Sequence, residues 1–235
     1  MFELIAFDAD DTLWHNEPVY HEMQDRFLAL LADYADPKTL EDALFQTEMR
    51  NLKYFGYGSK SFILSMIETA VQVSGEQVPA QTVAKLVDYA REMAQAEVRL
   101  LDHVHETVES LSRRYNLMVI TKGDLLDQEA KLTRSGLHEY FRYFETVPDK
   151  EPRRYAALLE RYRVTPRQFI MVGDSMRSDV LPVLALGATA VYVPYPVHWA
   201  HEHVDPPPDA HYHQLENIGG LPALLERLEQ EPGAA

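Results

Sequence analysis

The sequence contains no cysteine, which excludes disulfide bonds, thiolate metal sites and a cysteine nucleophile. It also contains no apolar run long enough to span a bilayer, and its first residues lack the basic segment of a signal peptide. We therefore expect a soluble, cytoplasmic protein. Positive charge is scarce, because 22 Lys and Arg residues face 37 Asp and Glu residues, for a formal net charge of −15. Such a chain repels phosphate backbones and anionic lipid, so we expect no nucleic-acid and no membrane partner.

The remaining composition is that of a globular protein, with 235 residues of which 46% are hydrophobic and 25% charged. A chain of this length buries enough surface to sustain a core in one or two domains. Short apolar runs typical of buried strands occur at residues 4–7, 117–120, 169–172 and 188–193. Helical patterns separate these runs, and this alternation predicts an α/β fold with a parallel sheet.

The stretch from about residue 18 to residue 98 interrupts the alternation. Its apolar residues recur at helical spacing, as Phe62, Met66 and Ala70 do, and a glycine-punctuated loop lies at residues 54–59. An all-helical domain is therefore expected as an insertion after the first strand. The predicted division is a Rossmann-like core of residues 1–15 and 99–235 and a helical cap of residues 16–98.

An acidic cluster follows the first strand, with Asp8 at its end and Asp10 two residues later. Side chains two apart in extended backbone share a face, and ligands of open α/β sheets bind beyond the carboxyl ends of the strands. Two carboxylates placed there can divide the work of nucleophile and of general acid and base. The alternative is a solvated turn in which Asp11 or Thr12 caps the following helix.

Further polar residues follow the other predicted strands. Asp174 ends the run at 169–172, with Asp179 five residues later, and a group of carboxylates on neighbouring strand ends suits Mg²⁺. Thr121 ends the run at 117–120, where its hydroxyl and the local amides can hold phosphate oxygens. Lys150 precedes a predicted helix and supplies a cation that offsets the clustered acids and a charged substrate.

These four elements, in this order, resemble the four motifs of the haloacid dehalogenase superfamily. Residues 8–12 (Asp-Ala-Asp-Asp-Thr) match the first motif, Thr121 the second, Lys150 the third and residues 173–179 the fourth. The match covers residues 2 to about 193, and the helical insertion resembles the helical cap of the family. Any one motif is a weak signal, whereas four in order are specific.

The resemblance implies a Mg²⁺-dependent hydrolase that acts on a small phosphate monoester. In such an enzyme Asp8 is the nucleophile that forms an aspartyl-phosphate, and Asp10 protonates the leaving oxygen and then activates water. The metal would be held by the side chains of Asp8 and Asp174 and the carbonyl of Asp10, with Asp179 binding the metal or its waters. Phosphoryl oxygens would be bound by Thr121 and Lys150.

Dehalogenases of the family generally lack an acid two residues after the nucleophile, so the resemblance at Asp10 favours phosphate chemistry. A phosphomutase shares that acid and stays an alternative, as does a binding protein that has kept the fold without turnover. The expected partner is a small phosphorylated metabolite, and the chain is expected to be a monomer or a homodimer.

Two residues depart from the common pattern of the family. Many relatives carry Asn after the second-motif residue, whereas this chain has Lys122, which either contacts phosphate or faces solvent. Pro often follows the third-motif lysine directly, whereas here Glu151 intervenes. We include Lys122 among the candidate substrate-binding residues, together with Thr121 and Lys150.

Two further segments carry open alternatives. In the loop at residues 53–60, Lys53, Tyr54, Tyr57 and Lys60 either contact the leaving group of a substrate or form a helix-joining turn. Five of the ten histidines lie between residues 198 and 213, where pairs two residues apart suggest either a second metal site or surface side chains. We expect surface side chains.

Overall fold

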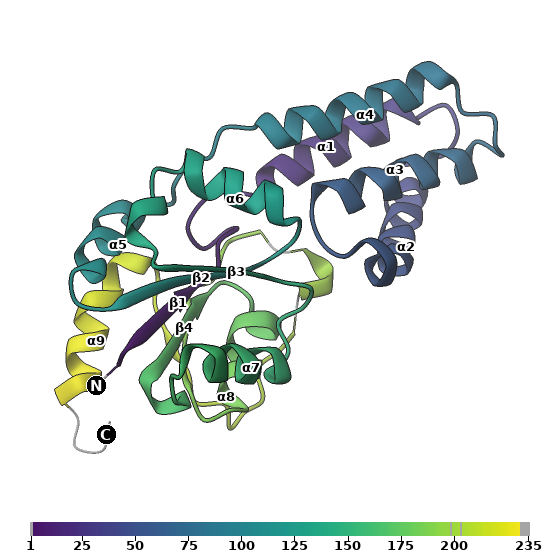
Figure 1. Cartoon of the computed structure of the whole chain (residues 1–235). Helices are drawn as coiled ribbons and strands as arrows, with labels where there is room; N and C mark the ends of the chain where they lie inside the picture. Colours follow the sequence, from purple (N-terminus) through teal and green to yellow (C-terminus); the bar gives the residue numbers. More distant parts are fainter. Residues whose placement is uncertain (1, 198, 203, 231–235) are drawn as a thin grey trace. The chain divides into compact units, whose positions relative to one another are not determined.

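The computed structural model describes residues 2–197, 199–202 and 204–230. Its described part contains a six-stranded sheet in the order β3-β2-β1-β4-β5-β6 (Figure 1). The pairs β1–β2, β1–β4, β4–β5 and β5–β6 are parallel. The strands are β1 (Leu4–Phe7), β2 (Asn116–Lys122), β3 (Tyr143–Val147), β4 (Phe169–Gly173), β5 (Thr189–Tyr192) and β6 (His213–Gln214). Because the strand order reverses at β1, the carboxyl ends of β1 and its neighbours form the edge at which open α/β sheets bind ligands.

The central strands are apolar on both faces because helices cover both sides of the sheet. Alternate residues of β1 point to opposite faces, so Ile5 and Phe7 pack in one core cluster and Leu4 and Ala6 in the other. One face is covered by α5 (Val104–Ser112), α6 (Leu125–Arg134) and α9 (Leu221–Gln230), and the other by α7 (Pro152–Tyr162) and α8 (Leu181–Leu184). Burial on both faces explains why the strands read as continuous apolar runs.

The chain divides into two compact units. The first comprises residues 1–17, 98–121 and 129–235 and contains the sheet. The second comprises residues 18–97 with the short segment 122–128, and most of it is helical. Its helices are α1 (Glu17–Leu30), which begins at the last residue of the first unit, α2 (Pro37–Phe55), α3 (Ser59–Val73) and α4 (Ala80–Gln95).

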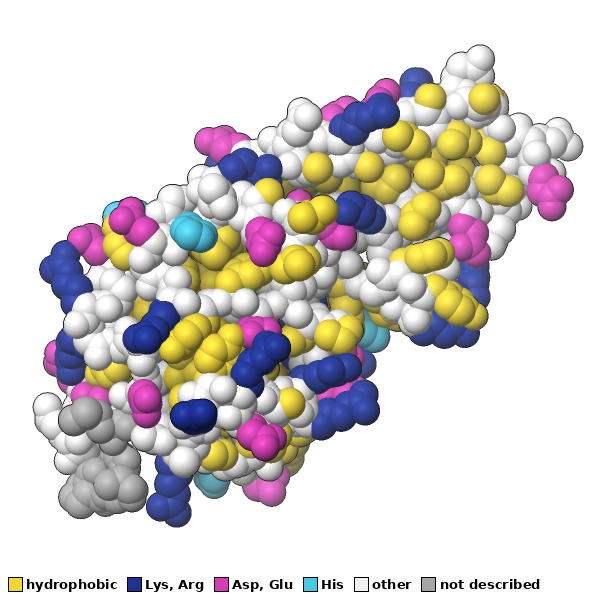
Figure 2. Space-filling view, in the orientation of Figure 1, with side chains coloured by type: hydrophobic (Ala, Val, Ile, Leu, Met, Phe, Trp, Pro, Cys, Tyr) yellow, Lys and Arg dark blue, Asp and Glu magenta, His cyan; other side chains and the backbone are white. Residues whose placement is uncertain are grey.

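The second unit has a core of its own. Phe27, Leu40, Met66 and Leu86 are fully buried in one apolar cluster contributed by α1 to α4. Helix α2 begins after Asp36, whose side chain accepts the amide of Thr39, with proline at the first helical position. Figure 2 shows apolar side chains gathered along α3 and α4.

The predicted α/β fold with a parallel sheet is confirmed, and β1 coincides with the predicted strand at residues 4–7. Two strands, β3 and β6, and helix α2 were not predicted. In the described residues, no helix is both long enough and apolar enough to cross a bilayer.

Candidate active site

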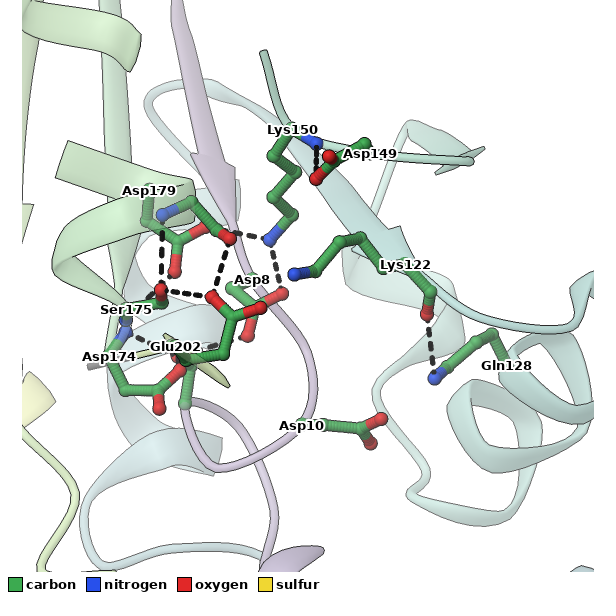
Figure 3. Close-up of polar contacts among 12 residues, drawn as sticks. Asp8, Asp10, Lys122, Gln128, Asp149, Lys150, Asp174, Ser175, Asp179 and Glu202 are labelled. Carbon is green, nitrogen blue, oxygen red and sulfur yellow. Dashed lines mark hydrogen bonds and ion pairs between the residues drawn. The ribbon is translucent and has the colours of Figure 1, made fainter. Parts of the chain in front are cut away.

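Three carboxylates meet at the carboxyl edge of the sheet. Asp8 follows β1, Asp174 follows β4, and Asp179 lies in a single π-helical turn, η3 (Met176–Val180), that begins beyond β4. One oxygen of each carboxylate lies within 4.8 Å of the other two (Figure 3). Asp8 and Asp179 are buried and Asp174 is half-buried. The structure therefore brings together three of the acids that the sequence analysis singles out.

Gly173 lets Asp179 enter this cluster. A methyl carbon attached at Gly173 would lie 2.2 Å from Oδ2 of Asp179 and 2.6 Å from its Cβ. The backbone of β4 thus occupies the space beside the carboxylate, and any side chain at residue 173 would displace it.

Lys150 lies between two of the carboxylates. Its ammonium donates to Oδ1 of Asp8 and, at 2.7 Å, to Oδ1 of Asp179, and its side chain is 1% exposed. Burial opposes the charged form, but the carboxylates of Asp179 and Asp8 outweigh it and raise the pKa of Lys150 well above its usual value. The lysine therefore stays charged and neutralises part of the acidic cluster.

The carboxylates outnumber this one ammonium, and the pKa values of two of them, Asp174 and Asp179, reflect burial and the remaining repulsion. Burial, together with the charges of Asp8 and Asp179, raises the pKa of Asp174 well above its usual range. Burial also raises the pKa of Asp179, to about 7, although Lys150 opposes the shift. A hard divalent cation accepts several carboxylate oxygens and relieves such repulsion, so the donor set fits Mg²⁺.

Hydroxyl and amide groups orient the acids. Thr12 Oγ1 donates to Oδ1 of Asp174 at 3.2 Å and accepts the amide of the same residue at 3.1 Å. The amide of Ser175 donates to Oδ2 of Asp179 at 3.0 Å. Asp11 plays a different part, because its carboxylate accepts the amides of Asn16 and Glu17 at 2.9 and 3.1 Å, where α1 begins. Asp11 therefore binds backbone amides at the start of α1, but it is buried and does not form the solvated turn of the alternative, while Thr12 contacts the acidic cluster.

Asp10 points away from the cluster of Asp8, Asp174 and Asp179 (Figure 3). Its Oδ1 accepts the indole Nε1 of Trp14 at 2.7 Å and the ammonium of Lys131 at 3.1 Å. The same ammonium lies 3.3 Å from Oδ2. The sequence does not identify Lys131, because a lysine near the end of an amphipathic helix is expected to be solvated and Lys131 belongs to no known motif.

A second residue of the site that the sequence does not predict is Glu202, in the short 3₁₀ helix η4 (Ala200–Glu202). Its Oε2 accepts the hydroxyls of Ser175 and Ser178, each at 2.6 Å. Arg177 donates to the carbonyl of His201 at 3.0 Å. These contacts hold η4 against the turn that carries Asp179. No sequence signal marks Glu202, since its partners are 24 and 27 residues away.

Thr121 is buried near the end of β2, and Lys122 is the last residue of that strand. The Lys122 ammonium lies 4.0 Å from the ring centroid of Tyr57, in a cation–π contact. Of the loop residues, Lys60 pairs with Asp124 at 2.8 Å. Lys53 lies over the ring of Tyr54.

Asp8, Asp174 and Asp179 form the one group of acids and histidines in the described residues that is arranged to hold a metal. Histidines 201, 211 and 213 are described and are not part of it. Histidines 198 and 203 lie outside the described residues.

Comparison with known proteins identifies a family and several relatives. A family model described as haloacid dehalogenase-like hydrolase matches residues 2–187. A glyceraldehyde 3-phosphate phosphatase from Methanothermobacter thermautotrophicus is 26% identical over 200 residues, which cover 82% of this chain and 86% of the relative. A phosphoglycolate phosphatase from Vibrio vulnificus is 25% identical over 202 residues, covering 82% of this chain and 84% of the relative.

The solved structures agree on the fold. A haloacid dehalogenase-like family hydrolase from Xanthomonas campestris superposes with a TM-score of 0.86 and 37% identity, covering 96% of this chain and 91% of that one. A 2-haloacid dehalogenase from Pseudomonas syringae, 22% identical with a TM-score of 0.65, shares the fold and covers 97% of this chain and 99% of its own. The resemblance inferred from four motifs is therefore confirmed, and this chain belongs to the haloacid dehalogenase-like hydrolases.

Proposed function

We propose that the chain is a Mg²⁺-dependent phosphatase that hydrolyses a small phosphate monoester through an aspartyl-phosphate on Asp8. The observation that carries this proposal is the meeting of Asp8, Asp174 and Asp179, with oxygens within 4.8 Å and the Lys150 ammonium bonded to Asp8. The phosphatase names of the curated relatives support it. A cytoplasmic location and a monomeric or homodimeric state stay predictions.

The metal would be held by the side chains of Asp8 and Asp174 and the carbonyl of Asp10, with Asp179 binding the metal or its waters. When bound, Mg²⁺ supplies positive charge that offsets the repulsion between an anionic nucleophile and an anionic phosphate. That repulsion is about 4 kcal/mol per pair of unit charges at about 4 Å and an effective dielectric constant of about 20. Lys150 supplies a second positive charge at the nucleophile itself.

The reaction then proceeds in two steps on residues of this chain. A carboxylate oxygen of Asp8 bonds to phosphorus while the bond from phosphorus to the ester oxygen breaks, and the leaving oxygen takes a proton from Asp10. A water molecule next attacks the phosphorus of the intermediate and gives a proton to Asp10, while the bond from phosphorus to the Asp8 oxygen breaks. This step releases phosphate and restores the Asp8 carboxylate. Thr121 and Lys150 bind the phosphoryl oxygens during the transfer, and Lys122 is a further candidate for this contact.

Activity with and without metal tests the proposal directly. The substrates are p-nitrophenyl phosphate, phosphoglycolate and glyceraldehyde 3-phosphate, each with Mg²⁺ and with EDTA. We expect wild-type hydrolysis that is lost in EDTA and in Asp8→Asn. Asp25→Asn, which alters an exposed acid of α1, serves as the control that keeps activity. Absence of wild-type phosphate release from every substrate, or an Asp8→Asn variant as active as wild type, would contradict it. Transfer to a second substrate hydroxyl instead of water would identify a phosphomutase.

A further inference from the structure

The environment of Asp10 contains a group that the proposed mechanism does not use. Lys131, near the end of α6, places its ammonium 3.1 Å from Oδ1 and 3.3 Å from Oδ2 of Asp10. The same ammonium donates to Oδ1 of Asn16 at 2.8 Å. An ammonium has three N–H donors, and these three oxygens surround it. The side chain of Lys131 is only 12% exposed, so protein oxygens replace most of its hydration.

The position of this ammonium is fixed by the fold. The next residue in the helix, Leu132, is 3% exposed and belongs to the apolar cluster that covers the sheet. This packing sets the rotation of α6 and directs residue 131 toward the loop after β1. The position of Lys131 is therefore fixed both by the packing of its helix and by the hydrogen bonds of its ammonium group.

Asp10 is held from two sides by groups that only donate. The indole Nε1 of Trp14, itself 1% exposed, donates to Oδ1 at 2.7 Å, and Lys131 spans both oxygens. Neither an indole N–H nor an ammonium accepts a hydrogen bond, so both match a carboxylate, which is purely an acceptor. Together they restrict the rotation of the side chain and fix the plane of its two oxygens.

Lys131 also offsets like charge in the same region. Burial and then the charge of Asp10 raise the pKa of Glu17, to about 7. Burial and, among the nearby charges, that of Asp10 raise the pKa of Asp11, to about 8. Three acids thus lie near one another at the start of α1, and Lys131 places its positive charge on the one nearest the catalytic cluster in sequence.

We propose that Lys131 is a positioning residue for the reaction, which holds the Asp10 carboxyl in the orientation that delivers and later accepts the proton. This inference rests on the proposed function, in which Asp10 protonates the leaving oxygen. When that proton leaves Asp10, a carboxylate remains, and the donors of Lys131 and Trp14 match this product of the step. Precise placement matters because misplacing a reacting group by about 1 Å costs on the order of 100-fold in rate.

Dependence on the leaving group separates this role from a structural one. An alcohol leaves poorly as an alkoxide and needs the proton of Asp10, whereas p-nitrophenol leaves as a stable anion. The test measures kcat/KM for p-nitrophenyl phosphate and for an alkyl monoester. The alkyl probe is whichever of phosphoglycolate, glyceraldehyde 3-phosphate and glycerol 3-phosphate the wild type hydrolyses fastest. Lys131→Met is compared with Asp10→Asn as reference and with Lys85→Met, which alters an exposed lysine of α4, as control.

We expect Lys131→Met to lower kcat/KM for the alkyl monoester by about 10-fold to 100-fold more than for p-nitrophenyl phosphate, a fraction of the contribution of general acid catalysis. Asp10→Asn should shift this ratio in the same direction and Lys85→Met should not shift it. Lys131→Arg, which keeps the positive charge, should bring the ratio of the two kcat/KM values part of the way back to that of wild type. It also provides a second variant if Lys131→Met does not fold.

Three outcomes would overturn the inference. Equal losses for both substrates in Lys131→Met would indicate a structural role alone. The ratio of kcat/KM for the alkyl monoester to kcat/KM for p-nitrophenyl phosphate could stay at the wild-type value in both Lys131 variants and fall in Asp10→Asn. That result would refute the role of Lys131 and leave the proposed function intact. An unchanged ratio in Asp10→Asn would remove the acid role of Asp10 and the inference with it. Absence of wild-type turnover of every monoester would instead refute the proposed function.

Discussion

Replacing Gly173 by alanine places a methyl group where the Asp179 carboxylate already lies. The new carbon would be 2.2 Å from Oδ2 and 2.6 Å from Cβ of Asp179, far inside van der Waals contact. The carboxylate has little freedom to yield, because it is 1% exposed and is bonded to Lys150 and to the amide of Ser175. Either β4 shifts or Asp179 turns away from its partners.

Both routes are costly. Overpacking a well-packed site costs about 1–3 kcal/mol, and breaking a buried ion pair by displacing one partner costs about 3–5 kcal/mol. We therefore expect Gly173→Ala to lower the free energy of unfolding by about 3 kcal/mol, which corresponds to a fall in Tm of about 6–12 °C for a chain of this size. We also expect hydrolysis to fall sharply, since Asp179 no longer meets Asp8 and Asp174.

Urea unfolding and thermal scans of wild type and variant measure this effect. Gly187→Ala is the matched control, because nothing lies within 4 Å of its added carbon and only the strain of its positive φ, +73°, contributes. That strain costs about 1–2 kcal/mol. A Gly173→Ala variant within about 0.5 kcal/mol of wild type, or less affected than Gly187→Ala, would refute the packing argument.

Three further predictions concern charge, metal and the loop that carries Glu202. Burial raises the pKa of Asp11 from 3.8 to about 8, so the folded protein keeps a proton that the unfolded chain releases in that range. Wild type in EDTA should therefore lose stability relative to Asp11→Asn as pH rises from about 4 to about 8, and Tm curves that run parallel over this range would contradict the shift. Mg²⁺ at about 100 times its Kd should stabilise wild type by about 2.7 kcal/mol and Asp174→Asn by much less, as thermal scans can show. Equal Tm shifts in the two proteins would place the metal elsewhere. Glu202→Ala removes the acceptor for the hydroxyls of Ser175 and Ser178, so we expect a loss of about 1–3 kcal/mol in urea unfolding. A loss below about 0.5 kcal/mol would mean that solvent replaces these contacts.

The sequence predicts the central strands because they are buried on both faces. Leu4–Phe7 is a continuous apolar run, and its bounds follow directly from its sequence. Strand β3 (Tyr143–Val147) lies at the edge of the sheet and is mostly half-buried. Because it contains the polar residues Glu145 and Thr146, its sequence has no continuous apolar run and resembles that of a loop. Strand β6 has only two residues and no periodicity to detect. Helix α2 begins with an Asp-Pro start signal, in which Asp36 is the N-cap and proline the first helical residue.

Some residues of the candidate site could likewise be predicted from the sequence, and others could not. The carboxyl ends of parallel strands meet at one edge of a sheet, so the meeting of Asp8 and Asp174 follows from strand order alone. Lys131 and Glu202 reach the site from a helix and from an irregular loop, and their placement depends on tertiary packing. Asp11 and Thr12 are neighbours in sequence but have different partners, since Asp11 binds amides at the start of α1 and Thr12 binds Asp174.

The central claim is that Asp8 becomes covalently phosphorylated during turnover. Rapid acid quenching of wild type with p-nitrophenyl phosphate and Mg²⁺, followed by peptide mass spectrometry, measures this directly. We predict the added mass of one phosphoryl group on the peptide that contains Asp8, its disappearance when substrate is exhausted, and its absence from Asp8→Asn and from EDTA-treated enzyme. Turnover without any phosphorylated peptide, or a phosphoryl group that persists in Asp8→Asn, would contradict the account.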